Sequence, residues 1–430
     1  MRRTCLLLLA LLLLFSTTAG AAKRRAVRPP SNPDVIGPDP NTVAGWLAIH
    51  GHTLSTPEFF TTGTAELAPL RGMIGDAEVV GLGDSTHGTH EFYTVKHRVI
   101  DFLVREMNFD AVVIEGPVAL VARLNEYVLG GDADPRPVLA QTMASPLFYT
   151  FWNNEEFLAV VEWMREYNAT RGDRTPVQIF GSDTYGQVDS WQHVVAYLRT
   201  VDAGLATTAE TEYACIGNNP LTRTCTAEAT RVHDAMAAAE ATLIARSSRH
   251  AFHTALYNAR MVILGQDYLS GRDAAMASNV TWVRENFSTS GRVVFWAHNS
   301  HVARIPMEFS NGKSSGEFLS QAYGDDYFVI GTMTGSGSFI QWNTVRGQLV
   351  DQTVTWGSLG SEQHESYLRQ RGSLPYLLPL RGTLPEWLNV PRVLNLSAAG
   401  TAISTQPELL PAVFDAVIYI DRTTPMHLLR

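Results

Sequence analysis

The sequence predicts an α/β fold with a mainly parallel central sheet, flanked by helices and joined by an inserted or packed helical hairpin or bundle. Three observations predict it. Short runs of β-branched and aromatic residues recur along the chain, helical patterns separate them, and one long stretch is helical throughout. In a chain of 430 residues, an apolar fraction of 45% is enough to bury such a sheet on both faces.

The strand-like runs come in a regular order along the chain. Each is short, and helical patterns lie between the first four, as expected for βαβ units. The runs are residues 78–83, 110–114, 177–181, 292–297, 327–332 and 414–420. The helical subregion spans about 226–290, where apolar residues recur at helical spacing.

The N-terminus has the pattern of a secretory signal peptide. Arg2 and Arg3 precede an apolar run over residues 5–15, and small residues follow at 19–21. We assign residues 1–22 to the signal peptide, 23–42 to an extended proline-containing leader, and 43–430 to one folded domain. The run is short for a membrane span, so we expect an exported protein with no membrane contact after cleavage; an uncleaved anchor is the alternative.

Export implies an oxidising compartment, where cysteines form disulfides. Cys215 and Cys225 lie ten residues apart in a polar segment. We therefore predict a local disulfide between them.

The charge balance argues against a nucleic-acid partner. The chain has 33 Lys and Arg against 42 Asp and Glu, a formal net charge of −9. Proteins that bind nucleic acids normally carry a basic excess.

Histidines and carboxylates follow the first four predicted strands. They are Asp84, His87, His90 and Glu91 after the first, Glu115 after the second, Asp183 after the third, and His298 and His301 after the fourth. Ligands of open α/β sheets bind outside the carboxyl ends of the strands, so these side chains are predicted to meet there. For His90 and Asp183, the alternative is that each caps a helix. A buried Glu115 would need a histidine or arginine partner.

Residues 312–316 match the G-x-S-x-G pattern of serine hydrolases, which needs a strand directly before it. No convincing strand precedes it here. We therefore interpret Ser314 or Ser315 as the N-cap of a helix over 317–323. Without a serine or cysteine nucleophile, the chemistry left is activation of water by a histidine general base.

Several segments resemble the erythromycin esterase family, whose signature is G-E-x-x-H-G-x-x-E-F. They cover most of residues 75–424 in the expected order. The segments are GDSTHGTHEFYTVKHRVIDFLV, FDAVVIEGP, FWNNEEFLAVVEWMREYN, IFGSDTYG, RDAAMASNVTWV, VVFWAHNSHV, SSGEFLSQAYGDDYFVIG and FDAVIYIDRTTP.

The resemblance implies an ester or lactone hydrolase that uses no covalent nucleophile, and macrolide lactones are its named substrates. We expect no cofactor and no metal. It implies that His87 is the general base for water and that Glu115 orients His87 or the water. His298 or His301 would position the attack or stabilise charge, and Arg272 would face the developing oxyanion.

Two positions depart from the family pattern. The glutamate of G-E-x-x-H is Asp84 here, so its carboxylate would sit about 1.5 Å further back. Many members have a basic residue nine positions after the signature histidine, and in this chain that residue is Lys96. A lysine does not freely replace the bidentate contacts that an arginine makes. Glu91 occupies the second acidic position of the signature.

Two other functions use the same residues. One is a metal-dependent hydrolase with His87, His90 and His298 as ligands and Glu91 as base. The other is a non-catalytic protein that binds carbohydrate or cell-envelope material in the same cleft.

Overall fold

The computed structural model describes residues 38–59, 64–141, 150–217, 225–306, 312–345, 348–398, 401–404 and 406–429. The predicted signal peptide lies outside these residues, as does the predicted leader up to residue 37. None of the helices in the described ranges combines the length and the apolar character that crossing a bilayer requires.

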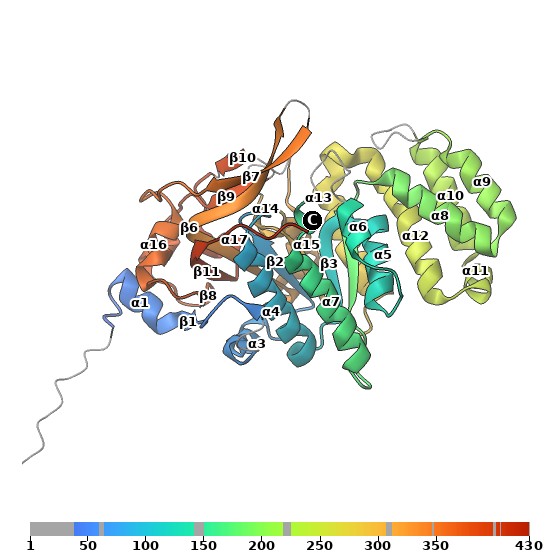
Figure 1. The fold of residues 1–430 in the computed structure, drawn as a ribbon. Helices are drawn as coiled ribbons and strands as arrows, with labels where there is room; N and C mark the ends of the chain where they lie inside the picture. The colour runs from blue at the N-terminus through green and yellow to red at the C-terminus, as the bar shows by residue number, and fades with distance from the viewer. Residues whose placement is uncertain are drawn as a thin grey trace, which may run out of the picture.

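The predicted fold class is confirmed, since a mainly parallel sheet forms the centre of the molecule (Figure 1). The parallel strands have the order β11-β6-β2-β5-β3-β4, and β8 and β1 continue the sheet beyond β11 in antiparallel pairs. The strands are β1 (His52–Thr53), β2 (Val79–Asp84), β3 (Ala111–Pro117), β4 (Gln178–Asp183), β5 (Val293–His298), β6 (Tyr327–Val345), β8 (Tyr376–Pro379) and β11 (Ala416–Thr423).

Alternate residues of each central strand enter two separate cores. In β5, Trp296 faces the core built with helices α4 (His90–Met107), α5 (Val118–Val128) and α7 (Glu155–Thr170), while Phe295 faces the core built with α13 (Tyr268–Asn286) and α15 (Ser315–Tyr323). Both faces of the sheet are therefore covered, which explains the nearly continuous apolar runs in its strands. The shorter helices are α1 (Val43–His50), α3 (Pro69–Ile74), α6 (Arg136–Gln141), α14 (Asn299–Val302), α16 (His364–Leu368) and α17 (Leu410–Val413).

A helical bundle packs beside the sheet, at the right of Figure 1, and has its own apolar core. It is larger than the predicted range of residues 226–290, because two helices precede that range. The bundle contains α8 (Gln187–Val201), α9 (Ala203–Tyr213), α10 (Thr226–Ala238), α11 (Glu240–Arg246) and α12 (Arg249–Leu264). The boundary was missed because α8 begins soon after β4 and resembles an ordinary crossover helix.

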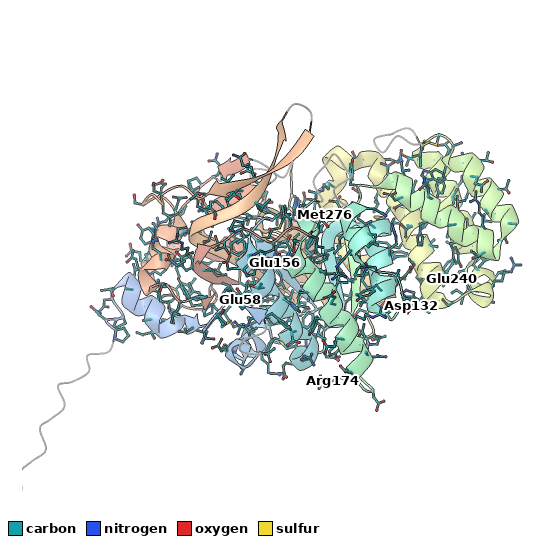
Figure 2. All side chains as sticks on the ribbon, in the orientation of Figure 1. Glu58, Asp132, Glu156, Arg174, Glu240 and Met276 are labelled. Carbon is teal, nitrogen blue, oxygen red and sulfur yellow. A yellow bond between two sulfur atoms is a disulfide. The ribbon has the colours of Figure 1, made fainter. Side chains whose placement is uncertain are left out.

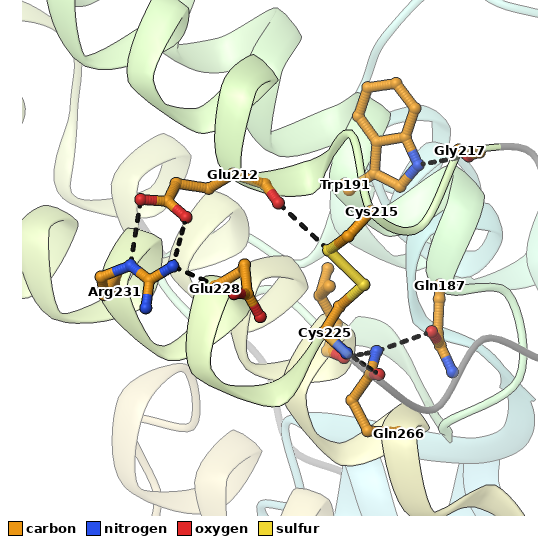
Figure 3. The surroundings of a disulfide bond; sticks show 10 residues. Gln187, Trp191, Glu212, Cys215, Gly217, Cys225, Glu228, Arg231 and Gln266 are labelled. Atoms are coloured by element: carbon orange, nitrogen blue, oxygen red, sulfur yellow. Dashed lines mark hydrogen bonds and ion pairs between the residues drawn. A yellow bond between two sulfur atoms is a disulfide. The ribbon is translucent and has the colours of Figure 1, made fainter.

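The predicted disulfide between Cys215 and Cys225 is present, with Cα atoms 6.0 Å apart (Figure 3). It joins the end of α9 to the start of α10. Arg231 in α10 also binds Glu212 in α9, with Nη2 and Oε2 2.7 Å apart. The backbone N–H of Cys225 donates to Oε1 of Gln266, at 3.1 Å. This hydrogen bond links the disulfide to the connection between α12 and α13.

Strand β6 is longer than predicted. The sequence indicated residues 327–332, but β6 continues to Val345 and pairs there with antiparallel β7 (Gln348–Thr355). Ile340 in this extension donates its backbone N–H to the carbonyl of Gly88, at 2.9 Å. Met426 donates to the same carbonyl at 3.0 Å. A second antiparallel pair, β9 (Asn395–Ala398) with β10 (Thr401–Ser404), lies outside the main sheet.

This close approach requires glycine at position 88. A Cβ atom there would lie 1.8 Å from the carbonyl oxygen of Ile340. We expect Gly88→Ala to lower the free energy of unfolding by about 1–3 kcal/mol, because either β6 or the loop before α4 has to move. Gly72→Ala is the control, since a Cβ at Gly72 in α3 meets nothing within 4 Å. Equal urea midpoints for the two variants would contradict this account.

Candidate active site

The parallel register brings the predicted polar residues to one edge of the sheet. Asp84 ends β2 and is paired in register with His298, which ends β5. Glu115 lies near the end of β3 between these strands and β4, and Asp183 ends β4. The carboxyl ends of parallel strands are where α/β proteins bind ligands.

His87 lies in the loop between β2 and α4. Its Nδ1 is 3.0 Å from Oδ1 of Asp84, and its Nε2 is 3.9 Å from Oε2 of Glu115. The ring stacks on Phe151, with centroids 4.1 Å apart and an angle of 10° between the planes. Asp84 thus lies at ion-pair distance from one imidazole nitrogen, while the other nitrogen faces a second carboxylate across a gap wider than a hydrogen bond.

A buried lysine holds the carboxylate that lies beside His87. Nζ of Lys96 donates to Oδ2 of Asp84 and lies 4.6 Å from the ring centroid of Trp296. Burial would raise the pKa of Asp84, but Lys96 and His87 outweigh it and lower that pKa to about 2. Burial lowers the pKa of Lys96 to about 8, against the opposing effect of Asp84. The shorter Asp84 therefore still reaches both His87 and the basic residue.

Glu115 collects partners from three elements. Its Oε1 accepts from Nη2 of Arg272 at 2.7 Å and lies 3.4 Å from Nε2 of His301. Its Oε2 accepts from the backbone N–H of His298 at 3.0 Å. Burial alone would raise the pKa of Glu115, yet His301, Arg272 and His87 hold it well below its usual range. The carboxylate is therefore ionised at neutral pH.

Arg272 is the centre of a second set of contacts. Its Nε and Nη2 donate to Oδ2 of Asp183 at 3.0 and 2.5 Å, and its Nη1 lies 2.9 Å from Nε2 of His301. His301 Nδ1 in turn lies 2.8 Å from Oδ1 of Asp273. Burial opposes it, but Asp273 and Glu115 raise the pKa of His301. Asp183 is not a helix cap, because α8 begins at Gln187 with Gly186 before it.

His298 is buried and shaped by its local backbone. His298 is the N-cap of α14, and its Nδ1 accepts from the backbone N–H of Ser300. Its Nε2 lies 3.3 Å from the carbonyl oxygen of Ser85. Burial, with the nearby His87, lowers the pKa of His298 to about 3, so the ring is neutral at pH 7.

Two predicted residues lie elsewhere. His90 is the first residue of α4 and contacts Glu156 and Glu58, at 2.6 and 3.0 Å. Glu91 accepts hydrogen bonds from the backbone N–H and side chain of Thr424, at 2.8 and 2.7 Å. The contacts of these two residues therefore do not support a metal site made by His87, His90 and His298 with Glu91 as base.

The G-x-S-x-G segment does not form a nucleophile elbow. Ser314 caps α15 by accepting from the backbone N–H of Glu317, as the sequence indicated. The Ser315 hydroxyl donates to Asp273, at 2.7 Å, rather than to a histidine. A serine hydrolase needs the hydroxyl on a basic nitrogen.

Sequence reasoning did not single out Phe151 or Asp273. Phe151 lies within the run FWNNEEF that resembles the family, and Asp273 directly follows Arg272. The only sequence signal for these two residues was that they lie in segments that resemble the family. Their roles, a stacking face for His87 and a partner for His301, depend on packing that the segments do not reveal.

An open groove lies beside the His87 loop, with a volume of about 1260 Å³. Among the described residues it is lined by Ile340 and Met426, which both bind Gly88, together with Asn153, His427 and Leu428. His87, Glu115 and Arg272 are not among the described residues that line it.

The mainly parallel sheet has a buried network of histidines and carboxylates at the carboxyl ends of its strands, which is where α/β proteins place binding and catalytic sites. The chain belongs to the erythromycin esterase family, because residues 104–423 match the family model. Glu115, Arg272 and His298 lie within this range, and His87 precedes it.

The chain is also similar to a curated protein in sequence and to solved structures in fold. The chain is 24% identical to erythromycin esterase type II of Escherichia coli over 312 residues, 63% of this chain and 72% of that protein. The fold matches the crystal structure of a succinoglycan biosynthesis protein with a TM-score of 0.78 and 24% identity, over 90% and 98% of the two chains. It also matches a mutant of the erythromycin esterase EreC in its open conformation, with a TM-score of 0.65 and 18% identity, over 86% and 97%.

The Asp84–Lys96 contact makes a prediction about stability. With Asp84 held at a pKa of about 2, below its unfolded value near 4, its ionised form stabilises the fold by on the order of 2 kcal/mol above pH 4. This stability is lost as the pH falls from about 4 to about 2. We expect Lys96→Met to destabilise the protein by about 3–5 kcal/mol at pH 7, because Asp84 loses its cation.

In Lys96→Met the loss of stability on acidification should also begin at a higher pH, because the pKa of Asp84 rises without Lys96. Urea midpoints measured between pH 3 and 7 test both effects. Lys313→Met is the control, because Lys313 is 43% exposed beside Glu317 and its surface ion pair contributes little. If both variants unfold at the wild-type midpoint, the contact does not stabilise the site.

Proposed function

We propose that this protein hydrolyses a carboxylic ester or lactone with water activated by His87, without a covalent nucleophile. The observation that carries this proposal is the setting of His87, with Asp84 at 3.0 Å on one nitrogen and Glu115 at 3.9 Å from the other. Membership of the erythromycin esterase family supports an ester or lactone as the substrate.

The proposed base is Nε2 of His87. With the proton of His87 on Nδ1, the nitrogen beside Asp84, the lone pair of Nε2 faces the site, and a water held there gives one proton to Nε2 as its oxygen attacks the carbonyl carbon. The imidazolium that forms lies between two ionised carboxylates, Asp84 and Glu115, which stabilise its charge. On collapse of the tetrahedral intermediate, His87 returns the proton to the leaving alcohol.

The oxyanion is assigned to Arg272 rather than to Lys96. Arg272 is 23% exposed, whereas Lys96 is 2% exposed and lies behind Asp84. A substrate carbonyl can therefore reach the guanidinium but not the ammonium. Glu115, Asp183 and His301 hold the guanidinium in place, and a preorganised donor costs no rearrangement during the reaction.

A macrolide-type lactone is the proposed substrate class. The groove of about 1260 Å³ beside the His87 loop has room for a large ring, and the relative from Escherichia coli is named as an erythromycin esterase. We also propose that the protein is exported, since residues 1–22 have the signal-peptide pattern and Cys215 and Cys225 form a disulfide.

The mechanism predicts that His87→Ala lowers kcat for hydrolysis by about 10²–10⁴-fold, the usual contribution of a general base, while KM changes little. The measurement is a panel of esters and macrolides, followed by mass spectrometry for the gain of one water. His233→Ala is the matched control, because His233 also contacts a carboxylate, Asp234 at 3.1 Å, outside the site.

Wild-type turnover in His87→Ala would exclude His87 as the base. Tight binding of a panel compound by wild type and His87→Ala, with no turnover in either, would favour a non-catalytic binding protein instead.

A further inference from the structure

A second cluster of histidines and carboxylates lies at the start of α4, separate from the His87 network. His90 in α4, Glu156 in α7 and His427 in the C-terminal segment meet there, and Glu58 approaches from the N-terminal region. Figure 2 labels Glu58 and Glu156, which lie in the same central part of the molecule. None of these side chains takes part in the proton transfer proposed above, although His427 also lines the groove described there.

Two imidazoles point at one carboxylate oxygen. Nδ1 of His90 and Nδ1 of His427 each lie 2.6 Å from Oε1 of Glu156. One ligand atom from each of the three residues lies within 4.8 Å of the others. Bonds of about 2.1 Å to a tetrahedral metal ion place ligand atoms about 3.4 Å apart, so a small expansion of the cluster is enough to admit one.

The far nitrogen of His90 has the contact that metal-bound histidines usually have. Its Nε2 lies 3.0 Å from Oε1 of Glu58. A carboxylate in this position accepts a hydrogen bond from the Nε2–H of His90, so a metal ion that displaces the Nδ1 proton would find the Nδ1 lone pair directed into the cluster. Glu58 thus stands in the outer position from which a carboxylate orients a metal-bound histidine.

The cluster has one buried, fixed ligand and one side that is open to solvent. Glu156 is 3% exposed, and its backbone position is fixed at the second residue of α7. His427 is 62% exposed, so an ion and a coordinating water can enter from solvent. Two imidazoles and one carboxylate favour Zn²⁺ or a similar transition metal over Ca²⁺ or Mg²⁺, which prefer oxygen ligands only.

We propose that His90, Glu156 and His427 bind a divalent transition-metal ion, with Zn²⁺ as the representative, and that Glu58 orients His90 for it. The ion would fasten the C-terminal segment to α4 and α7. That segment also donates from Met426 to the carbonyl of Gly88, at 3.0 Å, and from Leu429 to that of Asn153, at 3.2 Å. A metal here is therefore a structural clamp on the loops that carry His87 and Phe151.

The test is titration of the full chain with Zn²⁺ by calorimetry after dialysis against a chelator. We expect one ion per chain. His427→Ala and Glu156→Gln should each abolish this event, and Glu58→Gln should weaken it by about 10–100-fold, as loss of an outer partner does. His233→Ala and His87→Ala are controls that should bind as wild type does, since neither residue contacts the cluster.

A second readout is thermal unfolding with and without Zn²⁺. Zn²⁺ should raise the midpoint of wild type and leave that of His427→Ala unchanged, because an ion that binds only the folded state stabilises it. Absence of stoichiometric binding in wild type would overturn the proposal. So would binding that His427→Ala leaves intact. Neither result depends on hydrolysis, so either outcome leaves the proposed activity to be judged by its own assay.

Discussion

The negative charge of Glu115 is the constraint on which the site depends. A carboxylate that is 4% exposed is stable only when neighbouring groups compensate its charge. Glu115 obtains this from Arg272 in α13, the backbone of His298 at the end of β5, and His301 in α14. These partners come from distant parts of the sequence, so the same interaction that keeps the charge buried also assembles the site.

Much of the sheet could be predicted because its parallel strands are buried on both faces. The runs at 110–114 and 292–297 are apolar and β-branched, and they correspond to β3 and β5 with shifts of one to three residues at their ends. The extension of β6 beyond residue 332 could not be predicted, because the segment TGSGS there is rich in glycine and serine, which favour loops. It forms a strand because β7 and β11 supply backbone partners.

The site was predictable where a residue directly follows a strand, and less so beyond that. Asp84, Glu115, Asp183 and His298 come together because the strand register fixes them. His87 and His90 are only three residues apart, but one lies in a loop and the other begins a helix, and they contact different carboxylates. The spacing of the two histidines in the sequence does not predict that their side chains point in different directions.

The order in which the sheet is connected has a consequence for how this chain is made. β2 lies between β5 and β6, and Val79 pairs with Val293 and Tyr327. At a synthesis rate of about 5–20 residues per second, β2 waits about 10–40 s after it is made before the first of these neighbours exists. During that time an apolar strand has no sheet to join, which makes the nascent chain a natural client for a chaperone.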